Sequence, residues 1–251
     1  MINDTTCDDF LGGRVRALQP RKGYRAGVDP VLLAAFVPGK SGQSVLELGC
    51  GVGVASLCLA ARVSGMSFTG IEVQDTYADL ARRNAATNNA DFKIITADLR
   101  LLPADLRQSQ FDHVIMNPPY FDRRTGNPSV DKGRDTAMGG DTPLADWLGI
   151  GVRRIAPTGF LSMIQRIERL PEVLRMLEGR LGSIFVKPIA GRSGRAPERF
   201  LLQARKGGRA PFRMAPALIM HDGQRHQGDQ ESYSVQVQGV LRNGADLPIG
   251  F

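Results

Sequence analysis

Short apolar runs alternate along this chain with segments whose apolar residues recur at helical spacing. The first run, Ser44 to Leu48, predicts a buried strand, and the segment after it predicts a helix. The inward face of that helix would be formed by Val54, Leu57, Cys58 and Ala61. Because the alternation continues to Gln165, we expect an α/β fold with a doubly wound, mostly parallel sheet.

The later part of the chain predicts two more helices and three strands. Thr142 is expected to cap a helix with Pro143 in its first turn, and another helix is expected to start near Pro171. The buried stripe of the first of these helices would be Leu144, Trp147, Leu148, Val152 and Ile155. Strands are expected at Gly159–Gln165, Ser183–Ile189 and Arg199–Ala204. The link between the last two is too short for a crossover helix, so they should pair antiparallel and close the sheet.

Residues 1–40 are expected to form a lead-in to the sheet. Their pattern predicts a small hairpin, with one strand from Arg14 to Leu18 and the other near Tyr24, followed by a helix from Pro30 to Phe36. Residues 41–251 would form the main domain. A chain of 251 residues is long enough to bury one large α/β core, so we expect a single compact unit overall.

The apolar run from Phe111 to Met116 predicts a strand that ends in Asn117-Pro118-Pro119-Tyr120. Proline fixes its own φ and pushes the preceding residue into an extended conformation, so this turn should be stiff. The side-chain oxygen of Asn117 and the carbonyl of Pro118 can then accept the two hydrogens of an amine on a ring. The Tyr120 ring can cover the flat base. Pro-Pro pairs also mark ordinary turns, so the motif needs support from elsewhere in the chain.

That support comes from a glycine-rich corner, Gly49-Cys50-Gly51-Val52-Gly53, between the first predicted strand and its helix. Glycines allow close backbone approach, and the helix start offers unpaired N–H groups to a ligand. The spacing differs from the G-x-G-x-x-G pattern, which argues against NAD. Glu72 and Asp98 end the next two predicted strands, where they can accept hydrogens from ribose hydroxyls and from an adenine amino group. Either acid alone could be a solvated strand end, but four features in this order indicate a nucleotide-type site.

Together these motifs resemble the class I S-adenosylmethionine-dependent methyltransferases that act on amino nitrogens, over roughly residues 24–206. The resemblance implies a Rossmann-like, seven-stranded sheet and S-adenosylmethionine as methyl donor. The acceptor residues that it implies are Asn117, Pro118, Pro119 and Tyr120. The cofactor-binding residues that it implies are Asp29, Glu47, Gly49, Gly51, Gly53, Glu72, Asp98, Leu99 and Asn117.

A narrower likeness is to the bacterial family that methylates N6 of an adenine in tRNA1(Val), beside the anticodon. It rests on the segment from Gly23 to Ala34, on Arg134-Asp135 and on the late strand Arg199–Ala204. This family implies a tRNA partner, and the net charge of +7 favours an acidic partner of that kind. Basic side chains in predicted loops could meet its phosphates. Beside the acceptor motif these are Arg123, Arg124, Lys132 and Arg134, and elsewhere they are Arg14, Arg16, Arg21, Lys22, Arg25, Arg192, Arg195 and Arg199.

The cysteines and histidines indicate no metal site. No metal-ligand spacing links the three cysteines, which are Cys7, Cys50 and Cys58. His113 lies in a predicted strand, where a packed core histidine is commoner than a base, and His221 and His226 have no acidic or cysteine cluster around them. Few cysteines, no apolar signal core and no run of membrane-spanning length predict a soluble, cytoplasmic protein.

The predicted reaction is direct methyl transfer, in which the protein aligns donor and amine and needs no general base. Other amino nitrogens, such as an rRNA guanine or a protein glutamine, could use the same pocket. The short lead-in disfavours the glutamine enzymes, which usually carry a helical domain there. A small-molecule substrate is disfavoured by the flanking arginines. A non-catalytic protein that binds S-adenosylmethionine or RNA is disfavoured by the intact Asn-Pro-Pro-Tyr motif.

Overall fold

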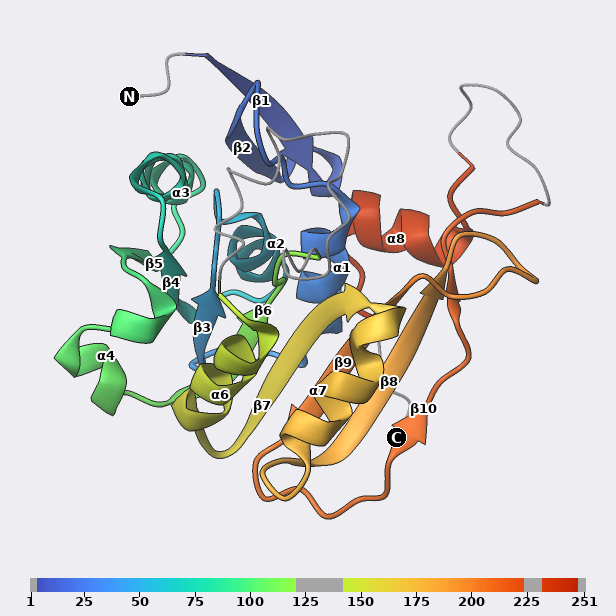
Figure 1. Ribbon diagram of the computed structural model, residues 1–251. Coiled ribbons are helices and arrows are strands. Elements are labelled where there is room, and N and C mark those ends of the chain that lie inside the picture. The colour runs from blue at the N-terminus through green and yellow to red at the C-terminus, as the bar shows by residue number, and fades with distance from the viewer. Residues whose placement is uncertain (1–3, 121–141, 224–231, 248–251) are drawn as a thin grey trace.

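The centre of the protein is a sheet with helices on both faces (Figure 1). The computed structural model describes residues 4–120, 142–223 and 232–247. Five neighbouring strands run parallel in the order β5-β4-β3-β6-β7. They are β3 (Ser44–Leu48), β4 (Ser67–Glu72), β5 (Phe92–Thr96), β6 (Phe111–Met116) and β7 (Ile155–Arg166). The chain builds outward from β3 in one direction and then in the other, so the order reverses between β3 and β6, as expected of a doubly wound sheet.

The sheet is closed by an antiparallel hairpin, as the sequence predicts. Strand β9 (Arg199–Arg205) lies between β7 and β8 (Gly182–Ala190) and runs antiparallel to both. Two short strands, β10 (Arg213–Met214) and β11 (Leu218–Ile219), pair with β8 and bring the sheet to nine strands. Strands of two residues carry no periodicity, which is why the sequence does not indicate them.

Helices cover the two faces of the sheet in two groups (Figure 1). One face carries α1 (Val28–Phe36), α2 (Val54–Arg62), α3 (Asp75–Thr87) and α8 (Val235–Asn243). The other face carries α4 (Ala104–Gln108), α6 (Leu144–Arg154) and α7 (Leu170–Leu177). Three 3-10 turns complete the described helical elements: η1 (Leu11–Gly13), η2 (Leu99–Leu101) and η4 (Ile167–Arg169).

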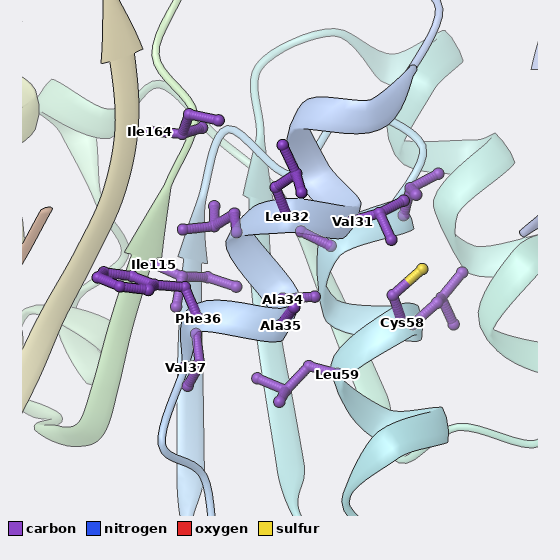
Figure 2. Close-up of a cluster of buried hydrophobic side chains, with 14 of the residues drawn as sticks. Val31, Leu32, Ala34, Ala35, Phe36, Val37, Cys58, Leu59, Ile115 and Ile164 are labelled. Atoms are coloured by element: carbon purple, nitrogen blue, oxygen red, sulfur yellow. The ribbon is translucent and has the colours of Figure 1, made fainter. Parts of the chain in front are cut away.

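Each face of the sheet has its own apolar core, because successive strand residues point to opposite sides. On β6, Ile115 joins the cluster beneath α1 and α2, whereas Val114 and Met116 join the cluster beneath α6 and α7. Figure 2 shows the first cluster, where Phe36 of α1 lies beside Ile115. Phe36 is 1% exposed. Burying a side chain of this size contributes roughly 2 kcal/mol, so α1 is fixed firmly to the sheet.

The predicted hairpin of the lead-in exists, and its strand from Arg14 to Leu18 is confirmed as β2 (Val15–Pro20), but the predicted partner strand near Tyr24 is wrong. Strand β2 pairs antiparallel with β1 (Thr5–Phe10), which lies before it, and Tyr24 lies in irregular structure. The β1 sequence is polar and acidic, so it has no alternating apolar pattern to reveal a strand. Its two acids form ion pairs: Asp8 accepts a hydrogen bond from Arg25, and Asp9 Oδ1 lies 3.7 Å from Arg16 Nε.

Two amides of α3 attach this hairpin to the main domain. The Asn84 side chain accepts from Leu18 N at 2.8 Å and donates to Leu18 O at 3.1 Å and to Val52 O at 3.0 Å. One turn further, Asn88, the C-cap residue of α3, makes the same pair of bonds to the backbone of Arg16. These side chains satisfy the outer edge of β2 as another strand would.

The start of α6 also differs from the prediction. Pro143 occupies the cap position, and no side-chain cap hydrogen bond is found there, so Thr142 is not the cap. Ile155 is fully buried as predicted, but it begins β7 and does not belong to the helix. The sequence predicts that this strand begins at Gly159, whereas β7 begins at Ile155. Helix α7 begins at Leu170 with Pro171 in its first turn, close to the expected start.

Candidate functional site

The predicted site residues meet at one edge of the sheet. The parallel strands β3, β4, β5 and β6 all end there, so the residues that follow them are neighbours in space. They surround a cavity of about 760 Å³, within the usual range for a small-molecule site. The predicted residues that line it are Asp29, Glu47, Gly49, Gly51, Glu72, Asp98, Leu99, Asn117, Pro118, Pro119 and Tyr120. Gly53 is not among the lining residues.

The glycine corner turns sharply between β3 and α2. Gly49, Gly51 and Gly53 have φ of +63°, +55° and +89°, a region that side chains strongly disfavour. Gly53 caps α2, and a Cβ there would lie 2.9 Å from Phe92. A Cβ on Gly49 would lie 2.3 Å from the Trp147 ring. Each of these two glycines thus has a packing reason for its lack of a side chain, whereas Gly51 faces more open space.

We expect Gly49→Ala to lower the free energy of unfolding by about 2 kcal/mol, from backbone strain and the clash with Trp147. Denaturant unfolding would measure this change. Gly191→Ala is the matched control, because nothing lies within 4 Å of its Cβ position. Equal effects of the two substitutions would contradict this account of the corner.

Glu72 joins the corner to the end of β4. Its Oε2 accepts from Gly51 N at 2.9 Å and its Oε1 accepts from Gln74 N at 2.9 Å. Burial raises its pKa, and the backbone donors act in the opposite direction. Each oxygen keeps a second lone pair, so the carboxylate can still accept from ribose hydroxyls while it holds the corner.

Glu47 is the other buried acid of the corner. Its Oε2 accepts from Ser56 Oγ at 2.5 Å and from Ser56 N at 3.2 Å, which ties β3 to the first turn of α2. Burial raises the pKa of Glu47 to about 8. These contacts anchor the helix that forms one wall of the cavity.

Asp98 lies at the cavity beside a cation that the sequence reading missed. Its Oδ1 accepts from Arg100 N at 2.8 Å, and its Oδ2 lies 2.7 Å from the Arg100 guanidinium. The hydrogen bond from Arg100 lowers the pKa of Asp98. A ligand amine would therefore share this carboxylate with Arg100. Leu99, which follows in η2, is 7% exposed and adds apolar lining.

The Asn-Pro-Pro-Tyr turn follows β6 at the same edge. Within the described part of the chain, no hydrogen bond of the Asn117 side chain is found, and Asn117 is among the residues that line the cavity. The Pro118 carbonyl accepts from Gln165 Nε2 at 3.3 Å. Gln165 is fully buried on β7, and its own Oε1 accepts from Arg166 N at 2.8 Å. The sequence reading missed Gln165, because a contact across strands leaves no local signal.

Tyr120 is held by two residues from distant parts of the chain. Its hydroxyl donates to Asp29 Oδ2, and Arg199 donates to Asp29 Oδ1. Burial raises the pKa of Tyr120, and the negative charge of Asp29 adds to this effect. The sequence predicts Asp29 beside the cofactor, and the structure brings it to Tyr120 and Arg199, which line the same cavity.

Of the remaining candidates, Cys50 lines the cavity, whereas His113, Cys7 and Cys58 do not. His113 is fully buried, stacks on Phe160 at 5.7 Å and contacts Gln43 Oε1 at 2.9 Å through Nε2. Burial lowers its pKa to about 4. Cys50 and Cys58 are buried, and Cys7 is exposed. Over residues 4–120, 142–223 and 232–247, no group of three metal-ligating side chains occurs and no helix is long and apolar enough to cross a membrane.

Of the predicted phosphate contacts, several basic side chains are engaged within the protein. Arg25 is bound to Asp8, Arg199 to Asp29, and Arg192 to the carbonyls of residues 222 and 223. His226 and the four residues Arg123, Arg124, Lys132 and Arg134 lie outside the described residues.

A cavity at the reversal of strand order, next to a glycine corner, is where class I methyltransferases hold S-adenosylmethionine, and we assign the chain to that class. The residues present fit this group. The spare lone pairs of Glu72 and Asp98 supply polar contacts to a nucleoside, and the apolar Leu99 supplies a flat one. S-adenosylmethionine supplies an electrophilic methyl group.

Comparison with known proteins agrees. Residues 27–132 match the family model of the methyltransferase small domain. A Shewanella loihica protein named tRNA1(Val) (adenine(37)-N6)-methyltransferase is 32% identical over 187 residues, which are 72% of this chain and 76% of that protein. A Porphyromonas gingivalis protein of the same name is 29% identical over 216 residues, with 78% and 81% covered. This chain belongs to their family, and it is an S-adenosylmethionine-dependent methyltransferase.

Solved structures agree on the fold. The crystal structure of a predicted O-methyltransferase from Agrobacterium tumefaciens superposes with a TM-score of 0.69 at 26% identity, covering 87% of this chain and 98% of that one. A Thermus thermophilus 16S rRNA methyltransferase, in complex with AdoMet and guanosine, gives 0.55 at 21% identity, covering 80% and 50%.

Proposed function

We propose that this enzyme methylates the N6 amine of an adenine in tRNA, and that this adenine lies beside the anticodon of tRNA1(Val). The observation that carries the proposal is the Asn117 amide, which has no hydrogen-bond partner among the described residues and lines the cavity together with Pro118 and Tyr120. The names of the relatives support the choice of RNA.

Two acceptors next to each other suit an amine that carries two hydrogens. Asn117 Oδ1 and Pro118 O would each accept one N–H of the adenine amine. Gln165 uses only one lone pair of the Pro118 carbonyl, so a second remains for the substrate. Held in this way, the nitrogen lone pair would leave the plane of the ring and face the methyl donor.

The proton balance requires no base in the site. A C–N bond forms as the S–CH₃ bond breaks, and the methylated nitrogen then releases one proton to water. His113 is not available for this proton, because it is buried in the core. Catalysis would consist of alignment and electrostatic stabilisation by Asn117 and Pro118.

The proposal is tested with bulk tRNA from a strain that lacks the gene. The purified enzyme and S-adenosylmethionine labelled in the methyl group are incubated with this tRNA, and the RNA is digested to nucleosides. We expect label in N6-methyladenosine, and mapping should place it beside the anticodon of tRNA1(Val). Label in N2-methylguanosine, or label only in rRNA or protein, would overturn the substrate assignment.

The basic residues around the acceptor motif give a second test. We expect charge reversal at Arg123 with Arg124, or at Lys132 with Arg134, to raise the Kd for tRNA and to flatten its salt dependence. Each lost phosphate contact should reduce the slope of log K against log salt by about one. Filter binding over a range of salt concentrations would measure both quantities.

The control for this test is charge reversal at Arg175 with Arg180. Both side chains are exposed, and they lie on α7 and in the turn before β8, at the opposite edge of the sheet. Unchanged tRNA methylation in the mutants near the motif, or an equal loss in this control, would contradict the predicted phosphate contacts.

A further inference from the structure

We propose that Asp29 and Arg199 form a positioning pair that fixes the Tyr120 ring against the acceptor base, so that Asp29 serves the acceptor side of the cavity and not the methyl donor. The proposal rests on the function proposed above. It assigns a role in acceptor recognition to two residues that lie 170 positions apart in the sequence.

The contacts form one continuous chain. The Tyr120 hydroxyl donates to one oxygen of Asp29, and the Arg199 guanidinium donates to the other. The side chains of Arg199 and Asp29 are 24% and 16% exposed, so the ion pair is largely shielded from water. Charge-assisted bonds to both oxygens of a carboxylate fix its orientation.

The fold explains why these three residues meet. Asp29 lies in the first turn of α1, where a negative charge is stabilised by the helix dipole. Arg199 is the first residue of β9, and it pairs with Arg166 at the end of β7. Because β9 runs antiparallel to β7, its first residue lies at the edge where the parallel strands end. The terminal hairpin thus places the Arg199 guanidinium next to the acceptor motif.

A hydrogen bond at the hydroxyl restrains the Tyr120 ring without covering it. The hydroxyl lies at the edge of the ring, so this contact occupies neither face of the ring, while it restricts rotation of the ring plane. A buried Tyr hydroxyl needs a partner, and Asp29 provides it. The raised pKa of Tyr120 keeps the hydroxyl protonated, so it remains a donor.

The charges argue against a donor role for Asp29. S-adenosylmethionine is a cation at its sulfur, and a lone carboxylate would attract it. Asp29 is paired with Arg199, which cancels most of that attraction. The same pairing engages Arg199 with a carboxylate of the protein, which argues against a contact between Arg199 and an RNA phosphate.

A double-mutant cycle tests the pair. Asp29→Asn and Tyr120→Phe should each lower kcat/KM for tRNA about tenfold, as expected for one charge-assisted hydrogen bond. The double mutant should lose no more than the worse single mutant, because Asp29 acts through the Tyr120 hydroxyl. Arg199→Lys should retain more activity than Arg199→Met. Arg205→Lys, at the opposite end of β9, is the matched control and should leave kcat/KM unchanged.

Two further measurements do not depend on the RNA substrate. The affinity for S-adenosylhomocysteine, followed by the fluorescence of Trp147, the only tryptophan and a cavity residue, should stay within about twofold in Asp29→Asn. The denaturant midpoint of the double mutant should equal that of the worse single mutant. Additive losses, or a product affinity at least about tenfold weaker in Asp29→Asn, would overturn the positioning role. If the parent enzyme methylates no tRNA, the proposed function fails. The product affinity and the denaturant midpoint would still show whether Asp29 acts through Tyr120 and not on the methyl donor.

Discussion

Replacing Asn117 by alanine is expected to lower the turnover number roughly 100- to 1000-fold, the usual cost of removing one aligned polar group at a reacting centre. The physical reason is that the Asn117 amide has no hydrogen-bond partner in the described chain, yet it lines the cavity at the end of β6. Its loss would leave the Pro118 carbonyl as the single acceptor for two amine hydrogens. Single-turnover methylation at saturating tRNA would measure the change.

The affinity for S-adenosylmethionine should change far less in the same variant. Asn117→Asp provides a sharper comparison, because a carboxylate also accepts hydrogen bonds and should retain more turnover than alanine. An equal loss of donor affinity and turnover would show that Asn117 serves chiefly the cofactor or the local structure, and the acceptor assignment would then be wrong.

Much of the site could be predicted because parallel strands end at a common edge. Glu72 is the last residue of β4, whereas Asp98 and Asn117 follow β5 and β6, and the sequence alone indicates the ends of these strands. Once the sheet is known to be doubly wound, these three residues must be neighbours. The glycine corner could also be predicted, because positions with positive φ favour glycine and three such glycines occur close together in the sequence.

What could not be predicted depends on contacts between distant segments. Asp29 meets Arg199 and Tyr120 only because α1 packs beside the start of β9, and no local pattern encodes that. Gln165 supports Pro118 across strands for the same reason. These residues are polar side chains with tertiary partners, and hydrophobic periodicity says nothing about them.

The lead-in hairpin shows the limit of periodicity in a second way. Strand β1 is polar and exposed along one side, so an apolar pattern cannot reveal it. The amides of Asn84 and Asn88 stabilise its partner β2 from outside, and asparagine within a helix is not a signal for a neighbouring strand. The sequence predicts the hairpin and its strand from Arg14 to Leu18, which is β2, but it places the partner strand on the wrong side, near Tyr24.

The second large effect is expected at Glu72. We expect Glu72→Gln to weaken S-adenosylmethionine binding about 100-fold, the effect of one or two hydrogen bonds to a charged group. Both carboxylate oxygens accept from backbone N–H groups, one from Gly51 and one from Gln74. Glutamine has the same shape, but its NH₂ group would have to face one of these donors. The glycine corner would therefore shift, and the acceptor for the ribose hydroxyls would be lost as well.

Calorimetric titration with S-adenosylmethionine and with its demethylated product would measure this loss, and denaturant unfolding would show how far the corner itself is weakened. Asp79→Asn is the control, because Asp79 is an exposed acid on α3 whose pairing with Arg82 contributes little. It should leave both affinities unchanged. If Glu72→Gln binds the donor as tightly as the parent enzyme, the ribose hydroxyls have another acceptor, and Glu72 would serve only to shape the corner.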